Sequence, residues 1–298
     1  MKDRSEGAAG TARIILGTAQ FSGKYGLLAG ERLESTQSDS QAIDLLDAAG
    51  RAGISALDTA PVYGQAEKLI GSSAWTGEVW TKLDPNIRPE DSVAQSLESL
   101  KRSRLEVLYV HNVSHFLTLD RPELEEIRAM RGPLVDALGV SAYEPKEVIA
   151  ALSRLDFDVV QVPVNPFDTR FVQAMRARRL PNECYYVGRS VFLQGLLAQP
   201  HLATARAPEE LRSAIRGWRV ACQELSVAPG EAALTWALSL PFLERVIVGA
   251  DSLSQLQEVT SWSQSERGSE ILHQIPVENL WPLSDPRTWT ALSRPGKE

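Results

Sequence analysis

The stretch ALDTAPVYGQAEKLIG, residues 56–71, contains the structural unit that recurs along the chain. It begins as a short apolar strand ending near Asp58, continues through a loop with proline and glycine, and enters a helical segment near Gln65. Short apolar strands that alternate with helices are typical of a parallel sheet covered by helices. The carboxylate of Asp58 at the strand end, and the phenol of Tyr63 just beyond it, require a separate explanation.

Similar units are expected over most of the chain. Apolar runs rich in β-branched residues predict strands at 13–18, 55–59, 78–83, 107–112, 136–141, 158–164, 185–190 and 245–249. Amphipathic segments between them predict helices at 38–53, 65–73, 90–103, 121–131, 145–154, 169–179, 207–226 and 252–263. In the first helix, for example, one face carries the apolar residues Ala42, Ile43, Leu45, Leu46, Ala48 and Ala49.

Eight strand–helix units without a change in composition predict the α/β class and one closed (β/α)8 TIM barrel, as a single domain. An open doubly wound sheet is the alternative, but it normally begins with a glycine-rich phosphate loop, and no G-x-G-x-x-G follows the first strand. Two segments are additional, namely an extra helix before the last strand at 228–241 and a C-terminal strap at 270–298. We expect residues 1–12 to be disordered and residues 13–298 to form the barrel domain.

The composition excludes several classes of function. The chain has 298 residues and a formal net charge of −7, with no block of lysine and arginine, so a nucleic-acid or anionic-membrane partner is not expected. Cys184 and Cys222 lie far apart and predict a reducing compartment, not a disulfide framework. No signal-peptide core is present, and no apolar stretch approaches about 18 residues. These features predict a cytoplasmic protein.

Four proton-carrying side chains are expected at one rim of the barrel. Asp58 ends the second strand, Tyr63 lies in the loop after it, Lys82 ends the third strand and His111 ends the fourth. Catalytic groups of such barrels gather at the C-terminal ends of the strands, and neighbouring strands lie about 5 Å apart. The four side chains can therefore meet.

Together these groups suit the donation of a proton. The ordinary pKa of tyrosine is near 10, and a neighbouring ammonium such as that of Lys82 lowers it. Asp58 would keep Lys82 charged and oriented, while His111 would hydrogen-bond a substrate oxygen or assist Tyr63. Hydride transfer to an aldehyde or ketone requires such a donor at the carbonyl oxygen. Each residue alone also has an ordinary structural explanation, and the joint pattern favours the catalytic one.

Seven motifs occur in the order found in the aldo-keto reductase family, which this chain resembles from LGTAQF to about Glu258. They are ALDTAPVYGQAEKLIG, WTKLD, YVHN, LGVSA, VQVPVN, RSVFLQGLL and VIVGADSLSQLQE. The resemblance implies a (β/α)8 barrel that transfers hydride between NAD(P)H and carbonyls. It also implies a catalytic tetrad formed by Asp58, Tyr63, Lys82 and His111.

The resemblance further implies a cofactor trough. Ser141 and Gln161 match positions that hold the nicotinamide carboxamide, residues 189–197 match the loop along the pyrophosphate, and residues 249–258 match the segment that grips the adenosine. The implied cofactor-binding residues are Gly17, Thr18, Asp58, Ser141, Gln161, Arg189, Ser190, Phe192, Gln194, Gly195, Gly249, Gln255 and Glu258.

The chain departs from the family pattern in three respects. Ala142 follows Ser141 where the family often has asparagine, and Arg189 replaces an aromatic ring that commonly stacks on the nicotinamide. Gly249 and Gln255 stand where the family commonly binds a 2′-phosphate with lysine and arginine, although backbone amides or nearby serines can still bind it. The resemblance favours NADP(H) as the cofactor, and NAD(H) stays possible.

Other sites are less well supported. His111 and His115 have metal-like spacing, but no third ligand is near in sequence, so no metal is expected. Ser141 and Ser190 lack an adjacent base, which argues against a hydrolase triad. The aromatic residues that either line an apolar substrate pocket or belong to the core are Phe21, Tyr25, Phe116, Phe167 and Trp281.

The sequence therefore predicts an NAD(P)(H)-dependent oxidoreductase that acts on a small-molecule carbonyl or the matching alcohol, with Tyr63 as the proton donor. Two alternatives remain at this stage. One is a redox-neutral sugar or specialised-metabolite enzyme that catalyses epimerisation or elimination on the same fold. The other is a non-catalytic subunit that senses the cofactor. The substrate, the reaction direction and the choice between monomer and homo-oligomer are left open.

Overall fold

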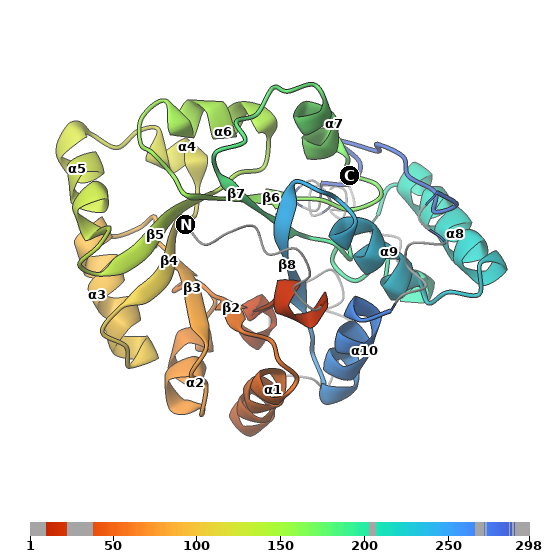
Figure 1. Ribbon diagram of the computed structural model, residues 1–298, viewed down its shortest axis with the longest axis horizontal. Helices are drawn as coiled ribbons and strands as arrows, with labels where there is room; N and C mark the ends of the chain where they lie inside the picture. The colour runs from red at the N-terminus through yellow and green to blue at the C-terminus, as the bar shows by residue number, and fades with distance from the viewer. Residues whose placement is uncertain are drawn as a thin grey trace, which may run out of the picture.

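The computed structural model describes residues 10–22, 38–202, 207–265, 271, 273–285, 287 and 289. Eight parallel strands form one closed barrel in chain order (Figure 1). They are β1 (Ile14–Gly17), β2 (Ala56–Asp58), β3 (Glu78–Lys82), β4 (Leu105–Val110), β5 (Val135–Ser141), β6 (Val159–Pro163), β7 (Tyr185–Arg189) and β8 (Leu243–Gly249). Pairing of β1 with β8 closes the barrel, and the predicted single-domain (β/α)8 fold is confirmed.

Helices form an outer layer around this barrel (Figure 1). They are α1 (Asp39–Arg51), α2 (Ala66–Ser72), α3 (Pro89–Leu100), α4 (Val113–Phe116), α5 (Arg121–Met130), α6 (Pro145–Leu152), α7 (Arg170–Arg176), α8 (Glu209–Glu224), α9 (Pro229–Leu238) and α10 (Leu253–Ser263). The predicted extra helix before the last strand is α9. The four-residue α4 was not predicted, because it is too short to show a helical period. Within the described residues, no helix has both the length and the apolar content needed to cross a bilayer.

Local sequence signals explain where several helices begin. Ser38 and Gln41 form a capping box at the start of α1, and Asp120 and Glu123 form another at the start of α5. In each pair the side chains accept hydrogen bonds from backbone N–H groups that have no partner inside the helix. Such caps typically contribute about 1 kcal/mol each, which fixes the helix boundaries near their predicted positions.

Side chains point alternately inward and outward along each strand, which divides the core into two layers. Ile15 faces the barrel interior, whereas Ile14 and Leu16 face the helices, as expected for successive residues of a strand. The interior cluster consists of Ile15, Ala56, Trp80, Val107, Tyr109, Val159, Val187 and Ile247. The barrel is thus a packed core and not a channel. The residues that follow this cluster lie at the C-terminal ends of the strands, which form the upper end of the barrel.

The N-terminal boundary differs from the prediction. Residues 1–9 lie outside the described residues, but residues 10–12 belong to the 3-10 helix η1 (Gly10–Arg13) and are not irregular. Thr11 is buried and accepts a hydrogen bond from the Gln264 side chain at 2.8 Å. The Arg13 guanidinium donates to the carbonyl of Leu238 at 2.7 Å. These contacts with the ends of α9 and α10 hold η1 in place.

The C-terminal segment crosses the loop after β6, as the predicted strap does. The N–H of Glu278 donates to the Pro166 carbonyl at 2.9 Å, and the N–H of Leu280 donates to the Phe167 carbonyl at 3.0 Å. Farther along, the Trp289 ring is 1% exposed. The strap therefore extends the structured chain to a position beside the upper end of the barrel.

Candidate active site

The alternation that fills the barrel interior also explains why polar side chains meet at its upper end. Two residues after interior Ala56, Trp80 and Val159 come Asp58, Lys82 and Gln161 respectively. Because alternate residues of a strand share one face, these polar side chains also point inward. In the same way, interior Tyr109, Val187, Ile247 and Ile15 are followed two residues later by His111, Arg189, Gly249 and Gly17 respectively.

Lys82 and Asp58 form a buried ion pair at the centre of this layer. The Lys82 Nζ donates to Asp58 Oδ1 at 2.7 Å and to the Thr59 carbonyl at 2.8 Å. The second carboxylate oxygen, Oδ2, accepts from Gln161 Nε2 at 2.8 Å. Lys82 is 1% exposed and Asp58 is 5% exposed. The ammonium is thus fixed in position by acceptors from β2 and the residue that follows it.

Tyr63 and His111 lie next to this pair. The Lys82 ammonium is 5.0 Å from the centre of the Tyr63 ring. The rings of Tyr63 and His111 meet edge to face, with their centres 6.0 Å apart. Tyr63 comes from the loop after β2, and His111 directly follows β4. The structure therefore brings the four sequence-predicted catalytic residues together.

The pKa values of Lys82 and Tyr63 follow from burial and charge. Burial lowers the pKa of Lys82, but the Asp58 carboxylate and Tyr63 together raise it above its ordinary value. Burial raises the pKa of Tyr63 above its ordinary value, and the Lys82 charge opposes this shift. Lys82 thus acts on Tyr63 in the expected direction, but burial is the larger effect, and the expected net lowering is not found. Tyr63 is protonated at neutral pH.

His111 is uncharged at neutral pH. Burial, followed by the positive charges of Lys82 and Arg189, lowers its pKa to about 3. A neutral imidazole offers one donor and one acceptor nitrogen. His111 is therefore available for hydrogen bonding to a substrate oxygen without adding a charge.

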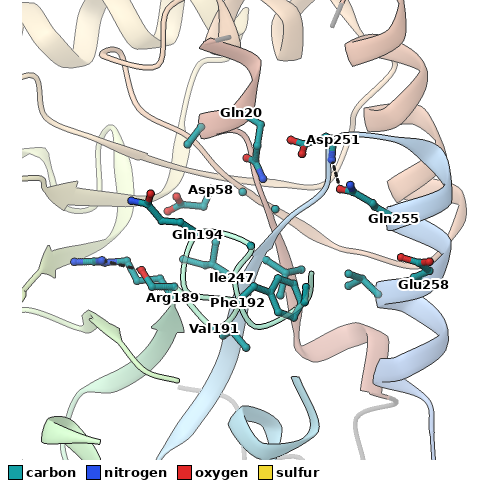
Figure 2. Close-up of a pocket in the computed structure, with 18 of the residues that line it drawn as sticks. Gln20, Asp58, Arg189, Val191, Phe192, Gln194, Ile247, Asp251, Gln255 and Glu258 are labelled. Atoms are coloured by element: carbon teal, nitrogen blue, oxygen red, sulfur yellow. Dashed lines mark hydrogen bonds between the residues drawn. The ribbon is translucent and has the colours of Figure 1, made fainter. Parts of the chain in front are cut away.

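A cavity of about 240 Å³ opens beside these residues (Figure 2). Arg189, Gln194 and Asp58 lie toward one end, and Gln255 and Glu258 lie toward the other (Figure 2). The predicted site residues that line it are Gly17, Asp58, Tyr63, Gln161, Arg189, Ser190, Phe192, Gln194, Gly195, Gly249, Gln255 and Glu258. The cavity thus joins the predicted catalytic end to the predicted cofactor segments.

Two of the predicted cofactor residues lie behind the cavity wall instead of on it. Thr18 is fully buried, and its Oγ1 donates to the Asp58 carbonyl at 3.1 Å. Ser141 is also buried, and its Oγ donates to Gln161 Oε1 at 3.2 Å. In this structure both side chains therefore position residues that do line the cavity.

The loop after β7 has an unusual backbone on the cavity wall. Ser190, Leu193 and Gln194 have φ values of 61°, 48° and 55°, in the left-handed region that non-glycine residues seldom adopt. Among the described residues, no acceptor binds the backbone N–H of Phe192 or of Gln194. Strained turns of this kind often accompany ligand sites, and free N–H groups in turns bind anions.

The opposite end of the cavity is formed by the start of α10. Ser252 caps this helix by accepting from the Gln255 N–H at 3.2 Å. The Gln255 side chain accepts from the Asp251 N–H at 2.8 Å (Figure 2). The exposed Glu258 lies one turn farther along. Ser252 and Gln255 are thus already used to hold the backbone at this end.

Aromatic residues considered for the substrate pocket lie elsewhere. Phe116 is fully buried against Phe157, and Phe167 packs against Trp218, so these two are core residues. Phe21 is half-buried against the core. The Arg170 guanidinium lies 3.2 Å from the centre of the Trp281 ring. Of these candidates none lines the described cavity, and Tyr25 lies outside the described residues.

The cavity also contains residues that the sequence did not identify as site residues. Gln20 packs so closely against Gly249 that a Cβ added there would lie 1.4 Å from Gln20 Nε2. Gly17 pairs with Gly249 where β1 meets β8, and this pairing brings Gln20, three residues after Gly17, next to Gly249. Closure of the barrel was therefore the signal that could have identified Gln20. The others are Ala19, Val191, Ala198, Gln199, Ile247, Val248, Asp251, Val259 and Trp262.

Comparison with known proteins shows which proteins this chain is similar to. A curated relative, the D-threo-aldose 1-dehydrogenase of a Pseudomonas species, is 27% identical over a match that spans 92% of this chain and 97% of the relative. The holo form of an aldo-keto reductase from Bacillus halodurans superimposes with a TM-score of 0.71 at 16% identity, covering 92% of this chain and 95% of that one.

A glycerol dehydrogenase from Gluconobacter oxydans gives a TM-score of 0.64 at 20% identity, covering 88% of this chain and 90% of that one. At these identities the two structures establish a shared fold and nothing more. A model of the Aldo/keto reductase family matches residues 13–267. Because that match covers most of the sequence, this chain belongs to the aldo/keto reductase family.

Proposed function

We propose that this protein is an NAD(P)(H)-dependent oxidoreductase that transfers hydride between a nicotinamide cofactor and an aldehyde or ketone, with Tyr63 as the proton donor. The observation that carries the proposal is the buried Lys82–Asp58 pair, which faces Tyr63 and His111 beside the cavity. Membership of the aldo/keto reductase family supports an oxidoreductase, as does the similarity to a dehydrogenase.

The cavity residues fit a nicotinamide dinucleotide. The backbone N–H groups of Phe192 and Gln194, which have no acceptor within the described part of the chain, suit the negative charge of a pyrophosphate. Gly17, Gly195 and Gly249 leave backbone accessible on the wall. Gln161 and Arg189 would hold the nicotinamide end, because the hydride must be delivered where Tyr63 donates its proton. Gln255 and Glu258 would hold the adenosine end. When bound, this cofactor supplies or accepts the hydride.

The protein's own groups would move the proton. Tyr63 is protonated at neutral pH because burial raises its pKa, so its hydroxyl is ready to donate to the carbonyl oxygen. The Lys82 ammonium stabilises the phenolate that remains after the transfer. Asp58 keeps Lys82 charged and directed at Tyr63. Neutral His111 would donate a second hydrogen bond to the substrate oxygen and help orient the carbonyl.

The choice between NADPH and NADH follows from the start of α10. A 2′-phosphate carries close to two negative charges and is usually bound by arginine or lysine. Gly249 has no side chain, and the Gln255 amide oxygen already accepts from the Asp251 N–H. We therefore propose weak discrimination between the two cofactors, within about tenfold, which corresponds to about 1.4 kcal/mol.

The proposal is tested by mixing the purified protein with NADPH or NADH and a panel of aldehydes, ketones and sugar aldoses, and by following the near-ultraviolet absorbance of the reduced nicotinamide. The reverse reaction with NADP⁺ or NAD⁺ uses aldoses and simple alcohols. Stoichiometric cofactor consumption with product formation is expected for at least one carbonyl class. Product formed without net cofactor change would indicate redox-neutral chemistry, and cofactor binding without any product would indicate a sensing subunit.

A further inference from the structure

Arg189 is a cation at the catalytic end of the cavity without a carboxylate partner among the described residues. It ends β7 and lines the same cavity as Tyr63 and Gln161. With described residues its guanidinium makes only long hydrogen bonds, to Ser190 Oγ at 3.3 Å and to the Ala142 carbonyl at 3.4 Å. Lys82, a second cation that lies near this end, is neutralised by Asp58. Arg189 therefore contributes a net positive charge to this end.

A second arginine and a tyrosine hold this charge in place. The Arg189 guanidinium carbon lies 4.2 Å from the centre of the Tyr143 ring, and that of Arg287 lies 3.8 Å from the same centre. Arg287 donates to both oxygens of Asp285, which fixes it in turn. Planar guanidinium groups stack well on aromatic rings. The C-terminal strap thus helps keep Arg189 at the cavity wall.

The positive charge reaches the groups that would react. Burial is the largest influence on the pKa of His111, and the charges of Lys82 and Arg189 lower that pKa further. Burial likewise has the largest effect on the pKa of Tyr63, and Arg189 is one of the charges that oppose the rise. Hydride transfer requires the nicotinamide ring close to the carbonyl that Tyr63 protonates, and therefore at the end of the cavity that Arg189 lines.

The two redox states of the ring differ in charge at that end. The oxidised nicotinamide carries one positive charge, and the reduced ring carries none. We propose, on the basis of the function proposed above, that Arg189 makes the site bind reduced nicotinamide more tightly than oxidised nicotinamide and so shifts the equilibrium between the two bound forms toward the reduced one. The difference arises because like charges repel in a partly buried site, whereas the neutral ring stacks on the guanidinium without this penalty.

The expected size is at least tenfold in the ratio of the two dissociation constants. For a two-electron couple, a tenfold preference for the reduced form raises the potential of the bound couple by about 30 mV. Wild-type protein should therefore bind NADPH at least tenfold more tightly than NADP⁺, or NADH than NAD⁺. The redox preference is a ratio within one cofactor and does not depend on how the adenosine end is recognised.

Titration of each redox state, followed by tryptophan fluorescence, measures this ratio without turnover, since Trp262 lines the cavity. Arg189→Met removes the charge and keeps most of the side-chain length, so the ratio should fall by about tenfold. Arg189→Lys is the matched control, because it keeps the charge and should keep the preference. A role confined to packing would weaken both redox states equally and leave the ratio unchanged.

Three results would overturn the inference. An unchanged ratio in Arg189→Met overturns it alone and leaves the proposed function intact. Tighter binding of the oxidised form by wild-type protein also overturns the inference alone. This measurement does not depend on whether a variant folds. Failure of wild-type protein to bind either redox state of either cofactor overturns the proposed function, and the inference with it.

Discussion

Replacing Lys82 by methionine should destabilise the protein by about 3–5 kcal/mol, because the Asp58 carboxylate then stays buried without its counter-ion. The two side chains are 1% and 7% exposed, and their charged atoms lie 2.7 Å apart. With an effective dielectric constant of about 20, Coulomb's law gives an attraction of about 6 kcal/mol at that distance. In the intact pair this attraction offsets the burial of both ions. The single variant loses the attraction and keeps the burial of Asp58.

The assay is urea unfolding followed by tryptophan fluorescence at about pH 7. Lys68→Met serves as a control, since Lys68 is exposed on α2 and its loss should cost less than about 0.5 kcal/mol. The double variant Asp58→Asn/Lys82→Met removes both charges and should recover at least about 1 kcal/mol relative to Lys82→Met. A loss below about 1 kcal/mol in Lys82→Met, or a double variant less stable than the single one, would refute this reasoning.

The pH dependence of this difference has a definite sign. Burial lowers the pKa of Lys82, but Asp58 and Tyr63 raise it above the ordinary 10.5 in the folded protein. A group whose pKa is raised by folding contributes its full stability below the unfolded pKa and loses it as the pH rises through the folded pKa. The gap between wild type and Lys82→Met should stay constant from about pH 7 to pH 9 and narrow above about pH 10.5.

Burial and nearby cations lower the pKa of His111 to about 3 in the folded protein, so the unfolded chain takes up the proton first as the pH falls below 6.5. Wild type should therefore lose stability between about pH 6.5 and pH 3. The His111→Gln variant should lose at least about 1 kcal/mol less over the same range. Acid titrations of both proteins measure this, and parallel curves would contradict it. Gln255→Arg should tighten NADPH binding by about tenfold and leave NADH binding nearly unchanged, whereas Gln257→Arg, on an exposed position of the same helix, should do neither. A wild-type preference for NADPH above about a hundredfold would show that backbone amides or serines already bind the phosphate. Gly139→Ala should destabilise the barrel by about 1–3 kcal/mol, because its Cβ would lie 2.4 Å from the Tyr109 ring. An unchanged urea midpoint would mean that the ring can move aside.

The sequence predicted the barrel well because each strand is a short apolar run next to an amphipathic helix. The period-two pattern then decides which residues point inward, so the meeting of Asp58, Lys82 and Gln161 could be anticipated from their places at strand ends. The four-residue α4 could not, because one turn shows no period. Residues 10–12 form part of η1 through contacts with the distant Gln264 and Leu238, which no local pattern reveals.

The finer features of the site depend on contacts between distant segments. Arg189 was identified, but its stacking on Tyr143 together with Arg287 from the C-terminal strap has no signature in sequence. Phe116 and Phe167 follow strand ends, as pocket residues do, yet both pack into the core. The net pKa of Tyr63 depends on the degree of burial, which the sequence does not give, and burial exceeds the opposing effect of Lys82.

The measurement that tests the central claim most directly compares Tyr63→Phe with wild type in two assays on the same preparations. One measures carbonyl reduction, and the other measures cofactor binding by tryptophan fluorescence. Loss of a general acid typically lowers the rate by about 10²–10⁴-fold, so kcat should fall by that factor while the cofactor Kd stays within about threefold of wild type. If Tyr63→Phe keeps more than half of the wild-type rate, then Tyr63 is not the proton donor and the proposed site chemistry is wrong.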